Sequence, residues 1–200
     1  MHIIPLTLLM ILLTAVTGCS DNTGSTANEK FTTTDITNAG IGGDFQLTDH
    51  NGNSKSLSSF KGKVVAVFFG YTHCPDICPT ALSELGYTLK ELGPDASRVQ
   101  VLFVTLDPQR DTKEVLAKYV PAFHPDSLGL RGNKETTATV AAKFKIHFET
   151  HGADSSGSYP MDHTSAVYVI DRQGRARLYM GGGRTAKNMI HDFRVLLQER

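Results

Sequence analysis

Two cysteines separated by three residues follow an apolar segment of the chain. The segment spans residues 64–69, and a four-residue connection, 70–73, leads from it to Cys74, with Cys78 shortly after. If a helix begins near Cys78, both sulfurs lie on one helix face, close to the positive end of the helix dipole. That environment lowers thiol pKa values and favours thiolates, which bind soft metals and attack disulfides. The pair therefore predicts copper-type ligation, dithiol redox chemistry, or both.

A third cysteine, Cys19, lies in a different context near the start of the chain. Residues 1–18 carry no acidic or basic side chain, and their apolar run from Ile3 to Leu13 has the length of a secretory signal core. The run leads into the sequence VTGC at residues 16–19, which is similar to a lipobox, although no Lys or Arg precedes it. We predict a lipoprotein signal peptide over residues 1–18, lipid attachment to Cys19, and a location on the extracytoplasmic side of a membrane, periplasmic or outer-surface.

Charge and cysteine content narrow the classes of function. The 200 residues include 20 basic and 20 acidic side chains, so the chain has neither a basic field for nucleic acid nor a polybasic patch for anionic lipid. One isolated cysteine pair in an exported protein does not make a disulfide-stabilised scaffold. The pair is therefore predicted to be functional, and no nucleic-acid partner is expected.

The composition changes between the predicted signal and the first hydrophobic elements. Residues 20–43 are rich in Ser, Thr, Asn and Gly and show no apolar periodicity. We predict that residues 19–43 form a lipidated, flexible tether and that residues 44–200 form a single domain.

The pattern after residue 44 alternates between strands and helices. Residues 64–69 and 99–106 are unbroken apolar strands of the kind buried on both faces, and leucines at helical spacing predict a helix over 79–92. The other expected elements are a hairpin over 45–57, a helix started by a capping box of Asp111 and Glu114, a helix over 134–144, a hairpin of 165–170 with 176–180, and a last helix around 189–197. This order predicts a mixed sheet with helices on both faces, and with the cysteines after the first core strand it indicates a thioredoxin-like α/β fold.

Three successive motifs resemble those of the Sco/SenC family. They are GYTHCPDICP at 70–79, TLDPQRDT at 105–112 and DHTSAVYVID at 162–171, and the similarity extends over about residues 44–199. Proteins of this family are membrane-anchored, thioredoxin-fold copper chaperones that help assemble the dicopper (CuA) centre of cytochrome c oxidase. The resemblance implies copper bound by Cys74, Cys78 and His163, with Asp107 in a loop near the site. It also implies that the partner is the copper-containing subunit of cytochrome c oxidase or another copper-accepting protein.

The donor atoms agree with that implication. Two thiolates and an imidazole form a soft, low-coordinate set that suits Cu(I) and can also hold Cu(II), whereas structural zinc usually takes four ligands. We place Asp162 beside the site, where it either orients the His163 loop or remains a solvated carboxylate. His73 is expected to be a polar neighbour and Met161 a packing residue, so neither is predicted to be a ligand. The remaining histidines have no mutual ligand spacing and are predicted to lie at the surface: His50, His124, His147, His151 and His191.

Two functions from different classes are consistent with these residues. As a copper metallochaperone, the protein binds the metal and passes it on by ligand exchange. As a thiol–disulfide oxidoreductase, it reduces the metal-binding cysteines of a partner through a mixed disulfide of Cys74 that Cys78 resolves. We take the metallochaperone as the primary hypothesis. His163 discriminates between the two, because dithiol exchange does not require an imidazole ligand.

Overall fold

The computed structural model describes residues 31–153, 155 and 159–199. The predicted signal peptide and Cys19 lie outside the described residues. The helices are α1 (Ile77–Leu92), α2 (Lys113–Tyr119), α3 (Lys134–Lys143) and α4 (Ala186–Gln198). The strands are β1 (Thr34–Asp35), β2 (Gln46–Asp49), β3 (Ser54–Ser56), β4 (Val64–Gly70), β5 (Val99–Thr105), β6 (Leu128–Arg131), β7 (Phe148–Thr150), β8 (Met161–His163), β9 (Val167–Ile170) and β10 (Ala176–Met180).

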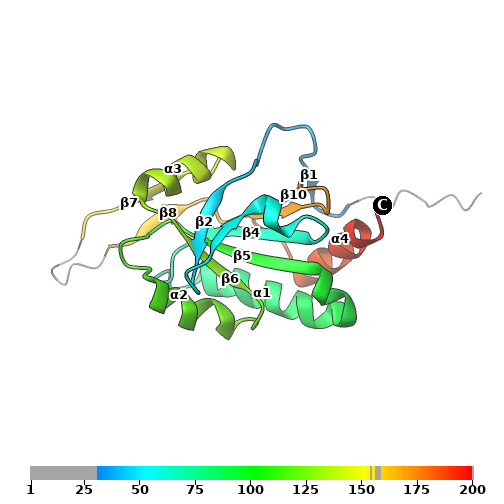
Figure 1. The fold of residues 1–200 in the computed structure, drawn as a ribbon, viewed down its shortest axis with the longest axis horizontal. Coiled ribbons are helices and arrows are strands. Elements are labelled where there is room, and N and C mark those ends of the chain that lie inside the picture. Colours follow the sequence, from blue (N-terminus) through cyan, green and yellow to red (C-terminus); the bar gives the residue numbers. More distant parts are fainter. Residues whose placement is uncertain (1–30, 154, 156–158, 200) are drawn as a thin grey trace, which may run out of the picture.

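One mixed sheet organises the domain (Figure 1). Its strand order over the described residues is β1-β10-β9-β4-β5-β6-β2-β3, while β7 and β8 form a separate two-stranded ladder. β4, β5 and β6 run parallel to one another, and β9 pairs antiparallel with β4. The carboxyl ends of β4 and β5 therefore lie together, and the loops that follow them meet at one end of the sheet.

Helices cover both faces of this sheet, which confirms the predicted α/β architecture. In Figure 1, α1, α2 and α4 lie on one side and α3 on the other. Alternate residues of β4 pack into the two cores: Phe68 belongs to the core under α1 and α4, and Phe69 to the core under α3. Because successive strand residues point to opposite faces, both sets must be apolar, which explains the unbroken hydrophobic run.

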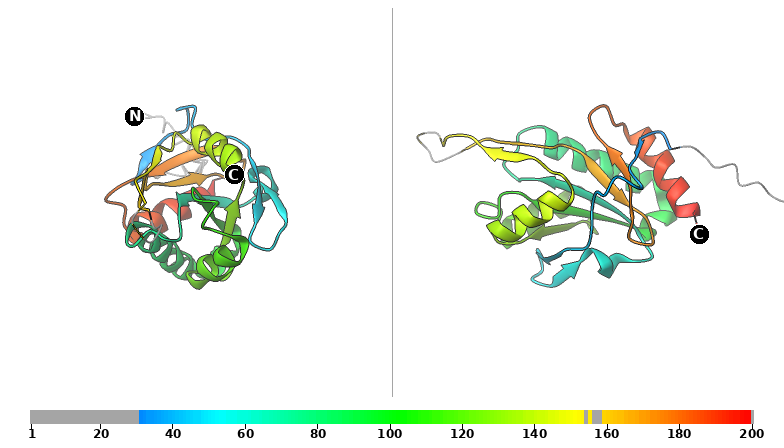
Figure 2. Two further views of the ribbon diagram at one scale, coloured as in Figure 1. Left: turned by 90° about the vertical axis from the view of Figure 1, so that its left-hand side faces the viewer. Right: turned by 90° about the horizontal axis from the view of Figure 1, so that it is seen from above.

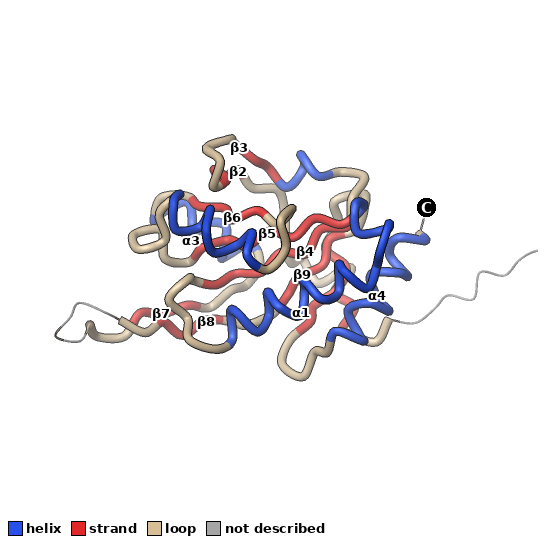
Figure 3. Tube along the Cα trace, turned by 90° about the horizontal axis from the view of Figure 1, so that it is seen from below, coloured by secondary structure: helices blue, strands red, loops and turns tan. Residues whose placement is uncertain are grey.

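The central helix pair lies next to the strand that precedes the thiols. The predicted leucine stripe of α1, which includes Leu82, Leu85 and Leu89, is buried against the sheet and α4. Figure 3 shows α1 and α4 side by side, with the β7–β8 ladder close to the first turn of α1. The position of the ladder matters for function because β8 carries His163.

The folded domain begins earlier than the predicted boundary at residue 44. β1 pairs antiparallel with β10, and Ile36 is buried. The backbone N–H groups of Thr32 and Thr33 donate to the carboxylate of Asp192 on α4, at 2.8 and 3.0 Å. Residues 31–43 therefore belong to the domain and not to a tether. These contacts lie far along the chain from one another, so local composition did not reveal them.

Two smaller predictions about secondary structure differ from the structure. β6 (Leu128–Arg131) adds a parallel strand that the sequence pattern did not predict. The N-cap of α2 is Thr112, whose hydroxyl accepts from the N–H of Val115 at 3.3 Å, so the predicted capping box of Asp111 and Glu114 was wrong.

The domain has two distinct ends. The first described residues and the end of α4 lie at one end, and the β7–β8 hairpin projects from the other (Figures 1 and 2). Within the described part of the chain, no helix has the length and apolarity needed to cross a bilayer.

Candidate metal centre

Three elements bring two sulfurs and an imidazole together. Cys74 lies in the loop after β4, Cys78 is the second residue of α1, and His163 ends β8. One donor atom from each of these residues lies within 4.8 Å of the other two, and the Cys78 Sγ is 3.4 Å from the His163 Nε2. The fold thus joins residues that are 85 positions apart in the sequence.

The two cysteines do not share a helix face as the spacing suggested. α1 begins at Ile77, so Cys74 lies before the helix. Its backbone N–H donates to the carbonyl of Tyr71 at 3.3 Å, which makes a tight turn at the end of β4. It is this turn, together with the start of α1, that brings Cys74 close to Cys78.

Burial sets the protonation of Cys78 and His163. Cys78 is fully buried, and this desolvation raises the pKa of its thiol despite the nearby helix N-terminus. The expected lowering of thiol pKa was therefore wrong for Cys78 in the metal-free protein. Burial also lowers the pKa of His163, which favours the neutral imidazole. A neutral imidazole and a thiol that must lose its proton are the states from which a metal centre assembles.

The orientation of His163 leaves one ring nitrogen available. The Nδ1 atom lies 3.1 Å from the Thr164 carbonyl oxygen, which can only accept, so Nδ1 carries the proton. Nε2 then directs its lone pair towards the Cys78 sulfur. Phe68 and Tyr71 flank the imidazole in edge-on contacts, with ring centroids at 6.3 and 5.8 Å. The ring is therefore held with its ligating atom towards the thiols.

A buried arginine connects the His163 loop to the helix that carries Cys78. The Arg184 guanidinium donates to the carbonyl of Ser165 at 2.7 Å and to the carboxylate of Glu84 on α1 at 3.0 Å. Ser165 lies two residues after His163, so this bridge fixes the spacing between β8 and α1. The sequence analysis did not identify Arg184, because nothing local marks it.

Glycine is required at the end of β4. A methyl group at position 70 would lie 2.6 Å from the Cys78 Sγ and 3.1 Å from the ring of Phe103. Only a residue without a side chain leaves room for that sulfur beside the strand. Gly70 belongs to the GYTHCPDICP motif, but its role as the space for a thiol could not be inferred from spacing.

Asp111 anchors the loop that contains Cys74. Its fully buried carboxylate accepts from the Thr72 N–H at 3.0 Å, the Thr72 hydroxyl at 2.6 Å and the Thr105 hydroxyl at 2.5 Å. Thr72 lies two residues before Cys74, and Thr105 ends β5. The carboxylate therefore joins the two loops that leave the parallel strands β4 and β5.

Replacing Asp111 with alanine is expected to lower the free energy of unfolding by about 2–4 kcal/mol, because the buried Thr105 hydroxyl and two half-buried donors of Thr72 lose their acceptor. Asp111→Asn should cost less, since asparagine keeps one acceptor oxygen and avoids a buried charge. Urea unfolding of the full-length protein in detergent measures both values. Equal stability of wild type and Asp111→Ala would contradict the anchoring role.

The difference in stability between the wild type and Asp111→Asn should depend on pH. Burial raises the pKa of the Asp111 carboxyl above its unfolded value. The folded state therefore binds this proton more tightly, and its contribution to stability is lost as the pH rises through the folded-state pKa. Asparagine does not titrate, so the Asp111→Asn variant does not lose stability in this way as the pH rises. The stability advantage of the wild type over Asp111→Asn should therefore be largest at acidic pH.

Asp107, expected in a loop near the site, lies in a buried network next to the donor group. Its carboxylate accepts from the Arg110 guanidinium and, at 2.9 Å, from the hydroxyl of Tyr159. The guanidinium also stacks 3.5 Å from the centre of the Tyr159 ring. Tyr159 lies four residues before His163, in the connection between β7 and β8, so the network attaches the segment that leads into β8 to the loop after β5. Asp107 itself is not among the three clustered donors.

The other residues considered from the sequence lie outside the donor cluster. Asp162 is a solvated carboxylate, with its side chain 80% exposed, and it pairs with His151 at 2.8 Å. His73 is exposed and contacts the Thr72 hydroxyl, while Met161 is buried. His50 was wrongly expected at the surface: it is buried, and its Nδ1 accepts from the N–H of Gly129 at 3.0 Å.

Comparison with known proteins identifies relatives over most of the chain. The SCO1/SenC family profile matches residues 33–198. The mitochondrial SCO2 homolog of Mus musculus is 37% identical over 154 residues, which cover 76% of this chain and 60% of the relative. The SCO2-like protein of Rickettsia conorii is 40% identical over 139 residues, 69% of this chain and 68% of the relative. The chain thus spans about three fifths of the length of the mammalian mitochondrial relatives it matches.

Solved structures give the same result. The copper-bound ScoI of Bradyrhizobium japonicum has a TM-score of 0.73 at 39% identity, covering 78% of this chain and 99% of that protein. The apo Sco1 of Thermus thermophilus has a TM-score of 0.75 at 37% identity, covering 84% and 98%. These likenesses agree with the thioredoxin-like fold. Together with the profile match across the described domain, they show that the chain belongs to the SCO1/SenC family.

Proposed function

We propose that the protein is a membrane-anchored copper metallochaperone that delivers copper to the CuA site of cytochrome c oxidase. The observation that carries the proposal is the convergence of Cys74, Cys78 and His163 within 4.8 Å. Sulfur and imidazole donors in a set of three suit Cu(I), which accepts low coordination numbers, and they can also hold Cu(II). Relatives that were solved with copper bound support this choice of metal.

The architecture of the centre fits transfer better than permanent storage. Cys78 is fully buried, whereas Cys74 is half-buried and lies in a loop. An incoming donor atom can therefore replace the accessible thiolate first while Cys78 and His163 still hold the metal. Stepwise exchange of this kind passes copper on without releasing the ion to solvent.

A lipid anchor would serve the same function. The lipobox-like sequence at residues 16–19 predicts lipid on Cys19, which would place the protein on the extracytoplasmic side of a membrane. If the CuA-containing subunit lies in the same membrane, this attachment would raise the rate at which the two proteins meet.

A copper titration tests the proposal. The full-length protein, purified in detergent and reduced, should bind one copper ion per chain and lose this capacity when Cys74 and Cys78 are oxidised to a disulfide. Mixing the loaded protein with the metal-free copper domain of the oxidase subunit should transfer copper, followed by the absorption of the CuA centre. A reduced protein without stoichiometric copper would exclude the chaperone function.

Thiol–disulfide exchange is the second candidate function. The unequal exposure of the two thiols supports it, because a partner can reach Cys74 while Cys78 stays buried. In this reaction the Cys74 thiolate attacks a disulfide of the partner and forms a mixed disulfide. Cys78 then attacks Cys74, so the partner leaves with two thiols and this chain keeps a Cys74–Cys78 disulfide, a transfer of two electrons. Reduction of the acceptor's cysteines by the copper-free protein, without copper transfer, would support this reaction instead.

A further inference from the structure

An open strand edge lies beside the candidate metal centre. β7 pairs with β8 on one side only, and no strand of the described chain pairs with its other edge. Thr164 N–H donates to the His147 carbonyl, and His151 N–H to the Pro160 carbonyl. In an antiparallel ladder, every second residue of a strand bonds with the partner strand. Since His147 and His151 bond towards the β8 side, the N–H and C=O groups of Phe148 and Thr150 are directed away from β8. No described residue bonds with these groups.

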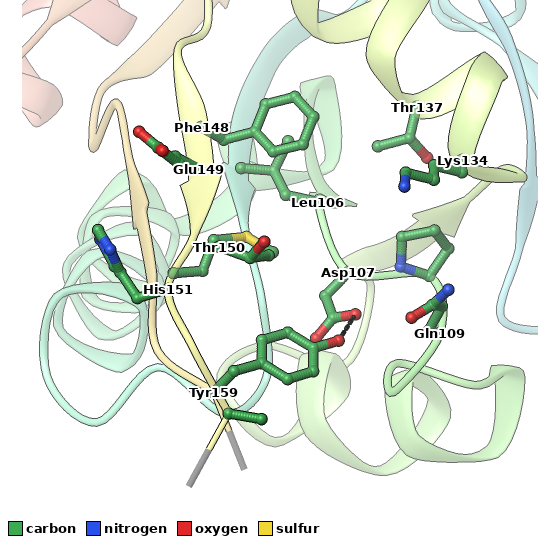
Figure 4. A pocket seen from close by; sticks show the side chains of 13 residues that line it. Leu106, Asp107, Gln109, Lys134, Thr137, Phe148, Glu149, Thr150, His151 and Tyr159 are labelled. Atoms are coloured by element: carbon green, nitrogen blue, oxygen red, sulfur yellow. Dashed lines mark hydrogen bonds between the residues drawn. The ribbon is translucent and has the colours of Figure 1, made fainter. Parts of the chain in front are cut away.

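The free edge borders a hollow of suitable size. A cavity of about 500 Å³ lies between β7, the first turns of α3 and the loop after β5. This volume is within the range of about 300–1,000 Å³ that is usual for ligand pockets. Figure 4 shows Phe148 and Thr150 pointing from β7 into the hollow, with Lys134 and Thr137 on the opposite side. We call this space, lined by β7 and the start of α3, the β7 groove.

The lining of the β7 groove has apolar, cationic and acidic parts. Of its two carboxylates, Asp107 is paired with Arg110, and Glu149 points away from the hollow in Figure 4. Leu106, Phe148 and Met161 contribute apolar surface. Lys134, at the N-terminus of α3, forms no ion pair with any described residue, so its charge adds to the positive end of the helix dipole. Thr137 also lines the groove, and its buried hydroxyl has no hydrogen-bond partner among the described residues. An occupant with an apolar side chain and a nearby carboxylate would complement the apolar surface and the charge of Lys134.

We propose that the β7 groove binds an extended, acidic segment of the copper-accepting protein, which adds to β7 as a third strand. The open groups repeat at alternate residues of one strand, and that repeat matches the backbone of an extended polypeptide, which a small molecule does not reproduce. The inference rests on the proposed function, because it names the acceptor as the occupant.

A segment docked on β7 would lie close to the metal centre. Phe148 is the cross-strand neighbour of His163. A strand added to β7 lies one strand spacing from β7 and two from β8, so its backbone runs about 10 Å from that of His163. At this distance, residues that follow the docked segment can reach the copper while the segment holds the acceptor in place.

Hydrogen exchange resolved to single amides tests the docking mode. The full-length protein in detergent is mixed with the metal-free copper domain of the oxidase subunit. The amides of Phe148 and Thr150 should exchange at least about tenfold more slowly in the complex, because they gain acceptors. The amide of Glu149, which faces β8, should change little. Protection that avoids both Phe148 and Thr150 would overturn the inference.

Charge reversal provides a second, independent measurement. Lys134→Glu should weaken binding of the acceptor domain about tenfold or more, because a carboxylate would then meet a carboxylate. Lys187→Glu is the matched control, since Lys187 also lies in the first turn of a helix but on α4. It should leave the affinity unchanged. Equal affinities for wild type and Lys134→Glu would overturn the inference.

The remaining outcomes separate the inference from the proposed function. If the wild type binds and transfers copper but Lys134→Glu and the two amides show no effect, only the docking mode fails. If the wild type binds no copper, the chaperone function fails and the acceptor loses its basis as occupant. Protection of Phe148 and Thr150 that rises with protein concentration, without the acceptor, would identify a second copy of this chain as the occupant and overturn the inference.

Discussion

His163→Ala should lower the affinity of the reduced protein for Cu(I) by at least about 100-fold, because the metal loses one of three ligands and no described donor replaces it. The Cys74–Cys78 disulfide should still form, since both thiols are carried by the loop after β4 and the start of α1, and His163 belongs to neither. Competition with a Cu(I) chelator measures the affinity, and mass spectrometry of alkylated samples measures the disulfide.

A neighbouring histidine provides the control for this variant. His147 is exposed, lies next to β7 and is outside the donor cluster, so His147→Ala should bind copper like the wild type. If His163→Ala kept the wild-type affinity, the imidazole would not be a ligand and the oxidoreductase function would gain support. If His147→Ala lost affinity as well, the effect would arise from disturbance of the hairpin.

Gly70→Ala is expected to have the second large effect, because the new methyl group would meet the Cys78 sulfur at 2.6 Å and the Phe103 ring at 3.1 Å. β4 is a central strand that cannot move away, so the sulfur and the start of α1 must shift instead. We expect a loss of about 1–3 kcal/mol in the free energy of unfolding. Copper affinity should fall too, since the displaced sulfur no longer faces His163.

A double variant shows whether the sulfur is the obstacle. Cys78→Ala removes the sulfur, so Gly70→Ala should cost much less stability in that background than in the wild type. Gly182→Ala serves as a control because a methyl group there meets no atom within 4 Å. Urea unfolding gives the stabilities. The steric explanation would fail if Gly70→Ala cost the same with and without the Cys78 sulfur.

The sequence predicted the parts of the fold that depend on long, regular patterns. The unbroken apolar strands β4 and β5 and the leucine stripe of α1 have strong local signals, and each was found where it was expected. β7 and β8 have three residues each and no clear alternation. The sequence therefore placed His163 in a loop, whereas it ends a strand of a projecting ladder.

The candidate site was also predicted only in part from the sequence. The three donors were identified from residue type and motif, and the structure brings them together. The roles of Asp111, Arg184 and Gly70 were missed. Asp111 bonds Thr72 across 39 residues and Arg184 bonds Ser165 across 19, so neither contact leaves a local signal. Gly70 acts by leaving space, which only the packed structure reveals.

The first described residues and the donor atoms lie at opposite ends of the domain, which affects how a partner can approach the site. Thr32 and Thr33 fasten the beginning of the domain to Asp192 on α4, at the end remote from the β7–β8 hairpin. If Cys19 carries a lipid, as proposed above, the membrane attachment would reach the domain at this end, opposite the thiols. A partner could then approach the thiols without meeting the anchor.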